Sequence, residues 1–228
     1  MLNKDALEQN SQPLFISFEG GEGCGKTTQL ELLQSILAEE NIKTVFTREP
    51  GGTEDGEAIR AMLLKGEQNK WSTTEELLMF SAARSKHVRE IIQPSLAKGK
   101  WVISDRFADS STVYQGYVQQ YDMETINMLH NLAVGTCWPD LTILLDIPVS
   151  IGLSRKNDQT QSGLDEIRFE SHGSEYHEKI RRSFLKLAEE NPKRITIVDA
   201  TGSIEEVQHR IINAINMALA KRVDMLAS

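Results

Sequence analysis

The sequence has little cysteine, no long apolar run and no excess of positive charge. Its 228 residues include two cysteines, Cys24 and Cys137, which argues against a disulfide framework and is typical of a reducing compartment. No apolar run approaches the roughly 20 residues that a membrane-spanning helix needs. The first residues, MLNKDALEQNSQP, lack the apolar stretch of a secretory signal. We therefore expect a cytoplasmic protein without a membrane partner.

The net charge of −8 argues against a protein that coats nucleic acid, because such proteins usually carry a basic surface. An apolar content of 39% and a charged content of 25% are typical of a globular protein with a full core. The length suits one α/β domain, or at most two small ones. We expect residues 13–222 to form that domain, residues 1–12 a disordered extension and residues 223–228 a tail.

Short apolar segments alternate with helical patterns along the chain. This alternation predicts an α/β fold in which a parallel five-stranded sheet has helices on both faces. The expected strands are mostly apolar, as strands buried on both faces should be. They span residues 14–18, 43–47, 101–104, 141–146 and 194–198, and the clearest helical patterns span 75–97, 176–187 and 204–219.

The segment FEGGEGCGKTTQ follows the first expected strand and precedes leucines at helical spacing. Residues 20–27 fit the pattern G-x-x-x-x-G-K-[ST], a loop whose amides wrap nucleotide phosphates. In this pattern the lysine reaches the β- and γ-phosphates and the hydroxyl binds magnesium. A glycine-rich turn before a helix is the simpler alternative. The expected ATP-binding residues are Gly20, Gly21, Glu22, Gly23, Cys24, Gly25, Lys26, Thr27 and Thr28.

Regulatory GTPases, ATP-driven motors and small-molecule kinases share this P-loop NTPase-type loop. The chain lacks the Asn-Lys-x-Asp guanine reader of the first class and the apolar strand ending in Asp-Glu of the second. Asp105 and Arg106 follow the third expected strand, and ligands of open α/β sheets collect at such strand ends. The carboxylate is suited to hold magnesium waters and the guanidinium to bind a second phosphate. A surface ion pair is the alternative.

Three further segments narrow the choice: TREPGGT, LLMFSAARS and DRFADSSTVYQG. Together with the phosphate loop, they make the sequence resemble the thymidylate kinases from about Phe15 to Leu219. The resemblance implies transfer of the γ-phosphate of ATP to dTMP, with Mg²⁺ as cofactor and a homodimer as the assembly. Another nucleotide or deoxynucleoside kinase of the same fold, or an ATP-binding regulator without catalysis, remains open.

The resemblance also implies roles for single residues. Phe80 would stack on thymine, and Arg84, one helical turn later, would contact a thymine carbonyl. Tyr114 would lie beneath the deoxyribose and crowd out a 2′-hydroxyl, Glu22 would lie near the 3′-hydroxyl, and Pro50 would be cis. The expected acceptor-binding residues are Glu22, Arg48, Pro50, Arg60, Phe80, Arg84, Arg106, Ser111, Tyr114 and Gln115, and the expected magnesium-associated residues are Thr27 and Asp105.

The phosphate loop contains no arginine before Lys26, so the family pattern implies that a lid over residues 155–168 supplies the catalytic arginine. Arg168 is the best match, and Arg155 and Lys156 are further candidates. An idle surface loop is an equally good interpretation of residues 155–163. The expected catalytic residues are Lys26, Asp105, Arg106 and Arg168. The five histidines (87, 130, 172, 177 and 209) lack metal-ligand spacing, and we expect them at the surface, with Arg181 and Arg182 on a solvated helix face.

Overall fold

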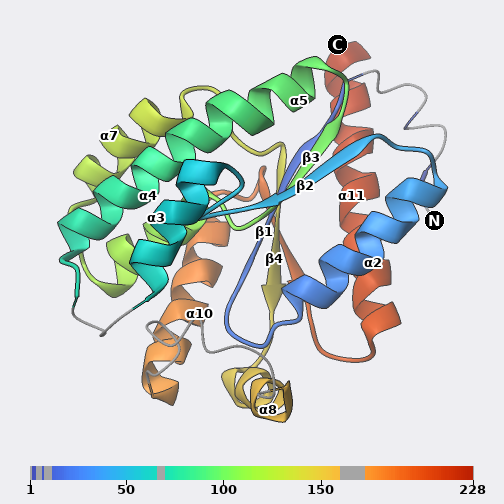
Figure 1. The fold of residues 1–228 in the computed structure, drawn as a ribbon. Helices are drawn as coiled ribbons and strands as arrows, with labels where there is room; N and C mark the ends of the chain where they lie inside the picture. Colours follow the sequence, from blue (N-terminus) through green and yellow to red (C-terminus); the bar gives the residue numbers. More distant parts are fainter. Residues whose placement is uncertain (1, 4–6, 8–11, 66–69, 160–172, 228) are drawn as a thin grey trace.

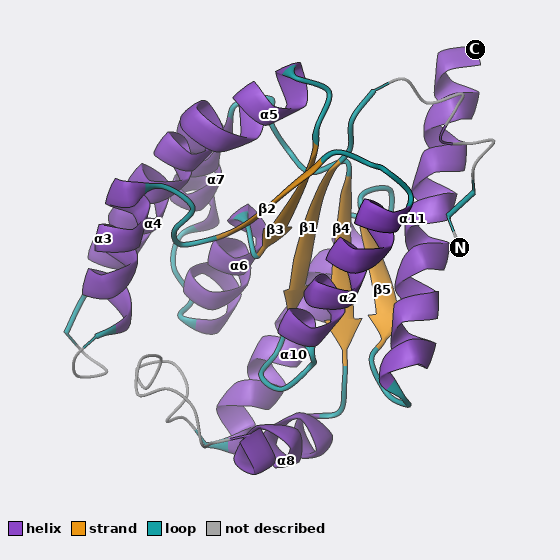
Figure 2. Cartoon of the chain, turned by 45° about the vertical axis from the view of Figure 1, so that its right-hand side comes forward, coloured by secondary structure: helices purple, strands orange, loops and turns teal. Residues whose placement is uncertain are grey.

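The computed structural model describes residues 2–3, 7, 12–65, 70–159 and 173–227. Within these residues, which Figure 1 colours along the sequence, five parallel strands form one sheet in the order β2-β3-β1-β4-β5 (Figure 2). The predicted parallel sheet is therefore confirmed, and each strand begins and ends within two residues of its predicted bounds. The strands are β1 (Phe15–Gly20), β2 (Thr44–Arg48), β3 (Trp101–Asp105), β4 (Leu141–Asp146) and β5 (Ile195–Asp199).

Helices cover both faces of the sheet (Figure 2). On one face, α2 (Lys26–Glu39) and α11 (Ile204–Ala227) pack on side chains such as Ile16 and Ile143. The other face packs on α5 (Gln93–Ala97), α7 (Met123–Val134) and α10 (Ser174–Glu190), and α4 (Thr73–His87) packs on α7. The remaining elements are α3 (Glu54–Leu64), α6 (Ala108–Ser111), α8 (Val149–Gln159) and the π-helical segments η1 (Val88–Ile92) and η2 (Thr112–Val118).

The two edge strands differ from the prediction that every strand is buried on both faces. All six residues of β1 are buried, but no residue of β2 is fully buried, and Ile197 of β5 is 47% exposed. The prediction was wrong for these two strands because an apolar sequence indicates a strand without giving its position in the sheet.

The central helix begins two residues earlier than predicted and is interrupted before its end. Ser72 caps it, since its hydroxyl accepts from the Glu75 amide while the Glu75 carboxylate accepts from the Ser72 amide. At η1 the helix widens, and the Gln93 amide donates to the Val88 carbonyl. Pro94, which has no backbone N–H to donate, follows directly in the first turn of α5.

The chain ends lie along the α11 face of the sheet. Leu2, within the segment expected to be an extension, is 3% exposed, and the Asn3 amide donates to Asn216 Oδ1 at 2.8 Å. At the other end, α11 continues to Ala227, past the expected domain boundary. In the part of the chain that the structure describes, no helix combines the length and apolar character of a membrane span.

Candidate functional site

The phosphate loop connects the carboxyl end of β1 to the first turn of α2. Gly25 precedes α2 with φ of 88°, a left-handed conformation that glycine adopts at little cost. It offers no side chain to the amides of the first helical turn, which therefore remain available to an anion. Cys24 is buried beneath the loop, 2% exposed.

The loop packs backbone to backbone against α8. A Cβ atom on Gly23 would lie 1.9 Å from the Gly152 carbonyl oxygen, and one on Gly152 would lie 2.4 Å from the Glu22 carbonyl oxygen. Lys156, one turn further along α8, forms an ion pair with Glu22 at 3.3 Å. The phosphate loop is therefore joined to the start of the predicted lid.

A first cavity extends from the phosphate loop past α8 to the loop after β5, and residues 21–29 line it. Burial and Arg106 lower the pKa of Lys26, but nearby groups that include Asp105 more than offset them. The net pKa is raised, so the ammonium stays charged. Asp105 also lines this cavity, and its Oδ1 is buried without a hydrogen-bond partner.

A second cavity lies between α4, the α6–η2 segment and α10. Phe80 and Arg84 line it from one face of α4, as their spacing predicts. The two cavities share the side chains of Glu22, Glu49, Arg60 and Arg106, so they meet there. The residues of the second cavity are Glu22, Glu49, Pro50, Arg60, Leu64, Phe80, Arg84, Arg106, Phe107, Ser110, Ser111, Tyr114, Gln115, His177 and Ile180.

Arg106 lies at the junction of the two cavities in a strained conformation. Its φ is 68°, which is uncommon for a residue with a Cβ atom, and its amide donates to the Phe18 carbonyl at 2.9 Å. Its guanidinium lies 5.5 Å from the Tyr114 ring centroid and 3.7 Å from Glu19 Oε2. Glu19 is 1% exposed and also accepts a hydrogen bond from the Phe107 amide at 2.9 Å. Buried contacts therefore fix the turn that carries Arg106.

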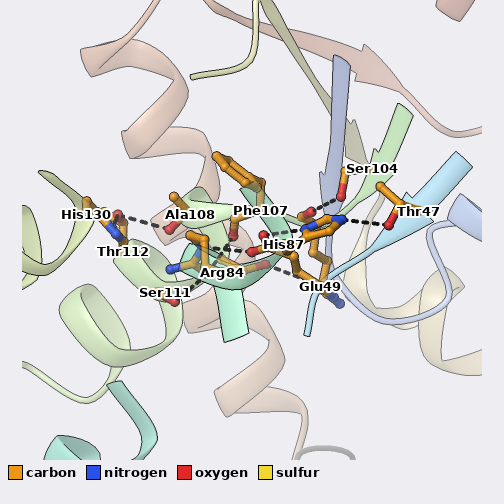
Figure 3. Close-up of polar contacts among 12 residues, drawn as sticks. Thr47, Glu49, Arg84, His87, Ser104, Phe107, Ala108, Ser111, Thr112 and His130 are labelled. Carbon is orange, nitrogen blue, oxygen red and sulfur yellow. Dashed lines mark hydrogen bonds and ion pairs between the residues drawn. The ribbon is translucent and has the colours of Figure 1, made fainter. Parts of the chain in front are cut away.

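Arg84 is held by a buried polar network (Figure 3). Its Nε donates to Glu49 Oε2 at 2.7 Å, and its Nη2 donates to Ser111 Oγ at 3.1 Å. The other Glu49 oxygen accepts from His87 Nδ1 at 2.9 Å. The Nη1 atom of Arg84 is buried and has no hydrogen-bond partner. The guanidinium thus keeps one donor group for another molecule.

The structure brings most of the predicted acceptor residues together but places Arg48 elsewhere. The side chain of Arg48 is 54% exposed, forms an ion pair with Glu57 at 2.9 Å and lines the first cavity. The Glu49–Pro50 peptide is cis, which confirms that prediction. Arg155 lines the first cavity and donates to the carbonyls of Ala200 and Gly202 at 3.2 and 3.4 Å. Arg168 lies outside the described residues.

The prediction of surface histidines was wrong for three of the five. His87, His130 and His177 are 0%, 3% and 6% exposed. His209 is exposed as predicted, and residue 172 lies outside the described part. Burial lowers the pKa of His130 to about 3, with Arg84 acting in the same direction.

Arg181 is less exposed than the prediction of a solvated helix face implies, whereas Arg182 agrees with that prediction. The side chain of Arg181 is 28% exposed. The guanidinium of Arg181 forks onto Asp146, with Nε–Oδ1 and Nη2–Oδ2 distances of 2.7 and 2.9 Å. The side chain of Arg182 is 77% exposed, as expected for a solvated helix face.

Sequence reasoning missed Glu19, Glu49 and His87. Glu49 lies inside the segment TREPGGT, directly before the predicted cis proline. A carboxylate at that position is the sequence feature that could have identified Glu49 as a site residue. His87 is 38 residues from Glu49. No local spacing pattern connects residues so far apart.

Comparison with known proteins gives consistent matches. The sequence model of the thymidylate kinase family matches residues 18–211. Thymidylate kinase of Rhodopseudomonas palustris (strain TIE-1) is 41% identical over 220 residues, 96% of this chain and 95% of that protein. Thymidylate kinase of Geotalea uraniireducens (strain Rf4) is 44% identical over 209 residues, covering 91% and 98%. The crystal structure of thymidylate kinase from Ehrlichia chaffeensis superposes with a TM-score of 0.72 at 34% identity, covering 90% and 99%.

Proposed function

The chain belongs to the thymidylate kinase family, and we propose that its two adjoining cavities hold ATP and dTMP while the γ-phosphate is transferred. Phosphorylation of dTMP is the activity that this membership supports. A different nucleotide or deoxynucleoside kinase and a non-catalytic ATP-binding regulator are not favoured.

One observation carries the assignment of the cavities. The cavity lined by the phosphate loop and the cavity lined by Phe80, Arg84 and Tyr114 meet at shared side chains, among them Arg106. Phosphoryl transfer needs two substrates in line and compensation of the transferring charge. Lys26 and the loop amides meet this need on the donor side, and Arg106 and Arg60 meet it at the acceptor phosphate. A pure ATP binder would have no use for the second cavity.

Mg²⁺ fits the donor side of the site. Asp105, whose buried Oδ1 has no hydrogen-bond partner, lines the first cavity together with Thr27. No cluster of three acidic, histidine or cysteine side chains suited to a metal occurs among the residues that the structure describes. This donor set suits a magnesium ion that keeps its waters and binds mainly to nucleotide phosphates. When bound, the ion compensates charge on the phosphate oxygens.

On the acceptor side, the positions of the side chains support the roles implied by the family. We assign thymine stacking to Phe80, a hydrogen bond to a thymine carbonyl to Arg84, and polar base contacts to Ser111 and Gln115. Tyr114 underlies the deoxyribose. Glu22 and Pro50 complete the wall, since both line the second cavity. Arg48, which pairs with Glu57 outside this cavity, is assigned to the donor side.

Arg168 remains our proposed catalytic arginine. The described part of the phosphate loop has no arginine between Gly20 and Lys26. Arg155 is occupied by backbone carbonyls of the loop after β5, so we assign it to ATP binding.

We also propose a homodimer that forms through α3, α4 and α7. These helices pack side by side, and their outer surfaces carry Met62, Leu78, Met128 and Leu132, which are 47%, 54%, 55% and 74% exposed. An apolar surface of this kind marks an interaction site more often than a solvated face.

A coupled assay of ADP release with a panel of acceptors tests the function. We expect turnover with dTMP and ATP, slower turnover with other pyrimidine monophosphates and none with thymidine. Turnover with thymidine in the absence of turnover with dTMP would contradict the assignment.

A further inference from the structure

The contacts behind Arg84 indicate how the acceptor base is selected, an inference that rests on the proposed function. Arg84 is 2% exposed, and its Nε and Nη2 atoms donate to Glu49, Ser111 and the Phe107 carbonyl. Only Nη1 lacks a hydrogen-bond partner, and the residue lines the second cavity. A guanidinium carries donors and no acceptor. Arg84 therefore offers the cavity a donor.

Glu49 is itself fixed from the side away from Arg84. His87 lies between Glu49 and Thr47 in Figure 3, with its Nδ1 at 2.9 Å from Glu49 Oε1 and its Nε2 at 2.7 Å from Thr47 Oγ1. A carboxylate only accepts, so Nδ1 carries the proton and donates. Glu49 and His87 are 5% and 0% exposed. We call Thr47, His87 and Glu49 the support chain.

The loop after the cis proline closes over the support chain. A Cβ atom on Gly52 would lie 2.6 Å from Thr47 Oγ1 and 2.7 Å from His87 Nε2. The Gly52 backbone therefore lies directly against the chain, and the space beside His87 admits no side chain at this position. Arg84 and His87 lie one turn apart on α4, so the same helix holds both ends of the network.

We propose that Thr47, Glu49 and His87 are positioning residues that fix Arg84 and thereby make the cavity select a base with a carbonyl rather than an amino group. If Arg84 is fixed, its free N–H group faces the amino group of a base that carries one. Both groups are donors, so both stay unpaired in a buried site, and this costs binding free energy. An arginine without its support would swing away and let water accept from the amino group. Selection therefore depends on the residues that hold Arg84.

His87→Leu tests the proposal, because it removes the support without touching the cavity wall. We expect the KM for dTMP to rise on the order of tenfold. The KM for ATP should change less than about twofold. The ratio of kcat/KM for dTMP to kcat/KM for dCMP should fall, because the variant discriminates less between the two bases. His87→Asn, which keeps a donor toward Glu49, should retain most of the wild-type ratio, and Thr47→Val should give a smaller change in the same direction.

Two comparisons separate positioning from general destabilisation. His130→Leu removes another buried histidine, whose partner is the Thr112 hydroxyl at 3.0 Å, and should lower Tm without raising the KM for dTMP. In an Arg84→Ala background, His87→Leu should add nothing, because the support chain acts through Arg84.

The proposal is overturned if His87→Leu leaves the dTMP to dCMP ratio unchanged, or if its full effect persists without Arg84. If His87→Leu does not fold, Thr47→Val alone decides by the same ratio. Absence of turnover with dTMP by the wild-type protein would instead contradict the proposed function.

Discussion

At the residue scale, Glu19 makes stability depend on pH. Burial raises its pKa from 4.5 to about 7, although Arg106 and hydrogen bonds from Ser110 and Phe107 lower it. Between these two pH values the folded protein binds more protons at Glu19 than the unfolded chain does. The contribution of Glu19 to stability is therefore complete below pH 4.5 and is lost as the pH rises to about 7.

Glu19→Gln should remove this dependence. Between about pH 5 and pH 8, the free energy of unfolding of the variant should rise relative to that of the wild type by on the order of 3 kcal/mol. Urea unfolding across this range measures the difference. Parallel pH profiles for the two proteins would mean that Glu19 is ionised in the folded state throughout.

Tyr114 is the residue to which we assign sugar discrimination. Its ring contacts the Phe184 ring edge to face at 6.1 Å and lies over the Arg106 guanidinium. Tyr114→Ala should narrow the gap in kcat/KM between deoxyribo- and ribonucleotide acceptors, because it opens space for a 2′-hydroxyl. Tyr114→Phe, which keeps the ring, should preserve the gap. A fixed ratio with both rates reduced would show that the ring serves packing alone.

What could be predicted at this scale depended on how local the signal was. Phe80 and Arg84 are four residues apart on one helix, so the helical repeat places them together. The environment of Glu19, Glu49 and His87 comes from partners on other elements. Glutamate and histidine are equally common on a solvated surface, so their presence in the sequence does not indicate burial. Charge and polarity in a sequence therefore do not reveal which polar side chains are buried in pairs.

At the element scale, the proposed lid defines a kinetic prediction. Arg168→Ala should reduce kcat on the order of 10²-fold and change KM less, because the arginine meets charge mainly in the transition state. Arg168→Lys should be nearly as damaging, since lysine lacks the planar fork. Steady-state kinetics with ATP and dTMP each varied measure both constants.

The matched control is Arg182→Ala, which removes an arginine that is 77% exposed on α10. It should leave kcat and KM unchanged. Arg155→Ala should raise the KM for ATP. If Arg168→Ala and the Arg155→Ala, Arg168→Ala double variant both keep near-normal kcat, the lid does not supply the catalytic charge.

The central helix shows what an element's sequence determines. Its apolar repeat predicted one helix over residues 75–97, and the capping box at Ser72 sets its beginning. The widening at η1 was not predicted, because hydrophobic periodicity averages over such a short departure. Pro94 is the local signal that favours an interruption.

At the scale of the whole molecule, the apolar surface over α3, α4 and α7 is the proposed dimer interface. A charged side chain introduced into this surface should therefore break the dimer. Leu132→Glu should convert a dimer into a monomer, because the unpaired carboxylate would have to be buried. Size-exclusion chromatography with light scattering measures the mass. Met217→Glu on α11, where the methionine is 60% exposed, is the control and should leave the mass unchanged. A wild-type monomer would contradict the proposed assembly.

Most of the fold could be predicted because alternating strands and helices have few parallel arrangements. Because β1 and β3 are neighbours in the sheet, their carboxyl ends place the phosphate loop beside Asp105. Whether a strand is central or at the edge follows from strand order. Ile197 is exposed because β5 is an edge strand. Strand order is a property of the complete sheet that no single segment carries.

The contact between the phosphate loop and α8 limits which substitutions this sequence can accept during evolution. Gly23 and Gly152 are 129 positions apart, yet each lies where a Cβ atom would overlap the other segment's backbone. Neither position can accept a side chain by a single substitution unless the loop and the helix separate. Among homologous chains that keep this contact, we therefore expect glycine at both positions. Chains that lose one glycine should have lost the contact, and with it the requirement for glycine at the other position. An alignment of such chains, scored for covariation of these two columns, would test this.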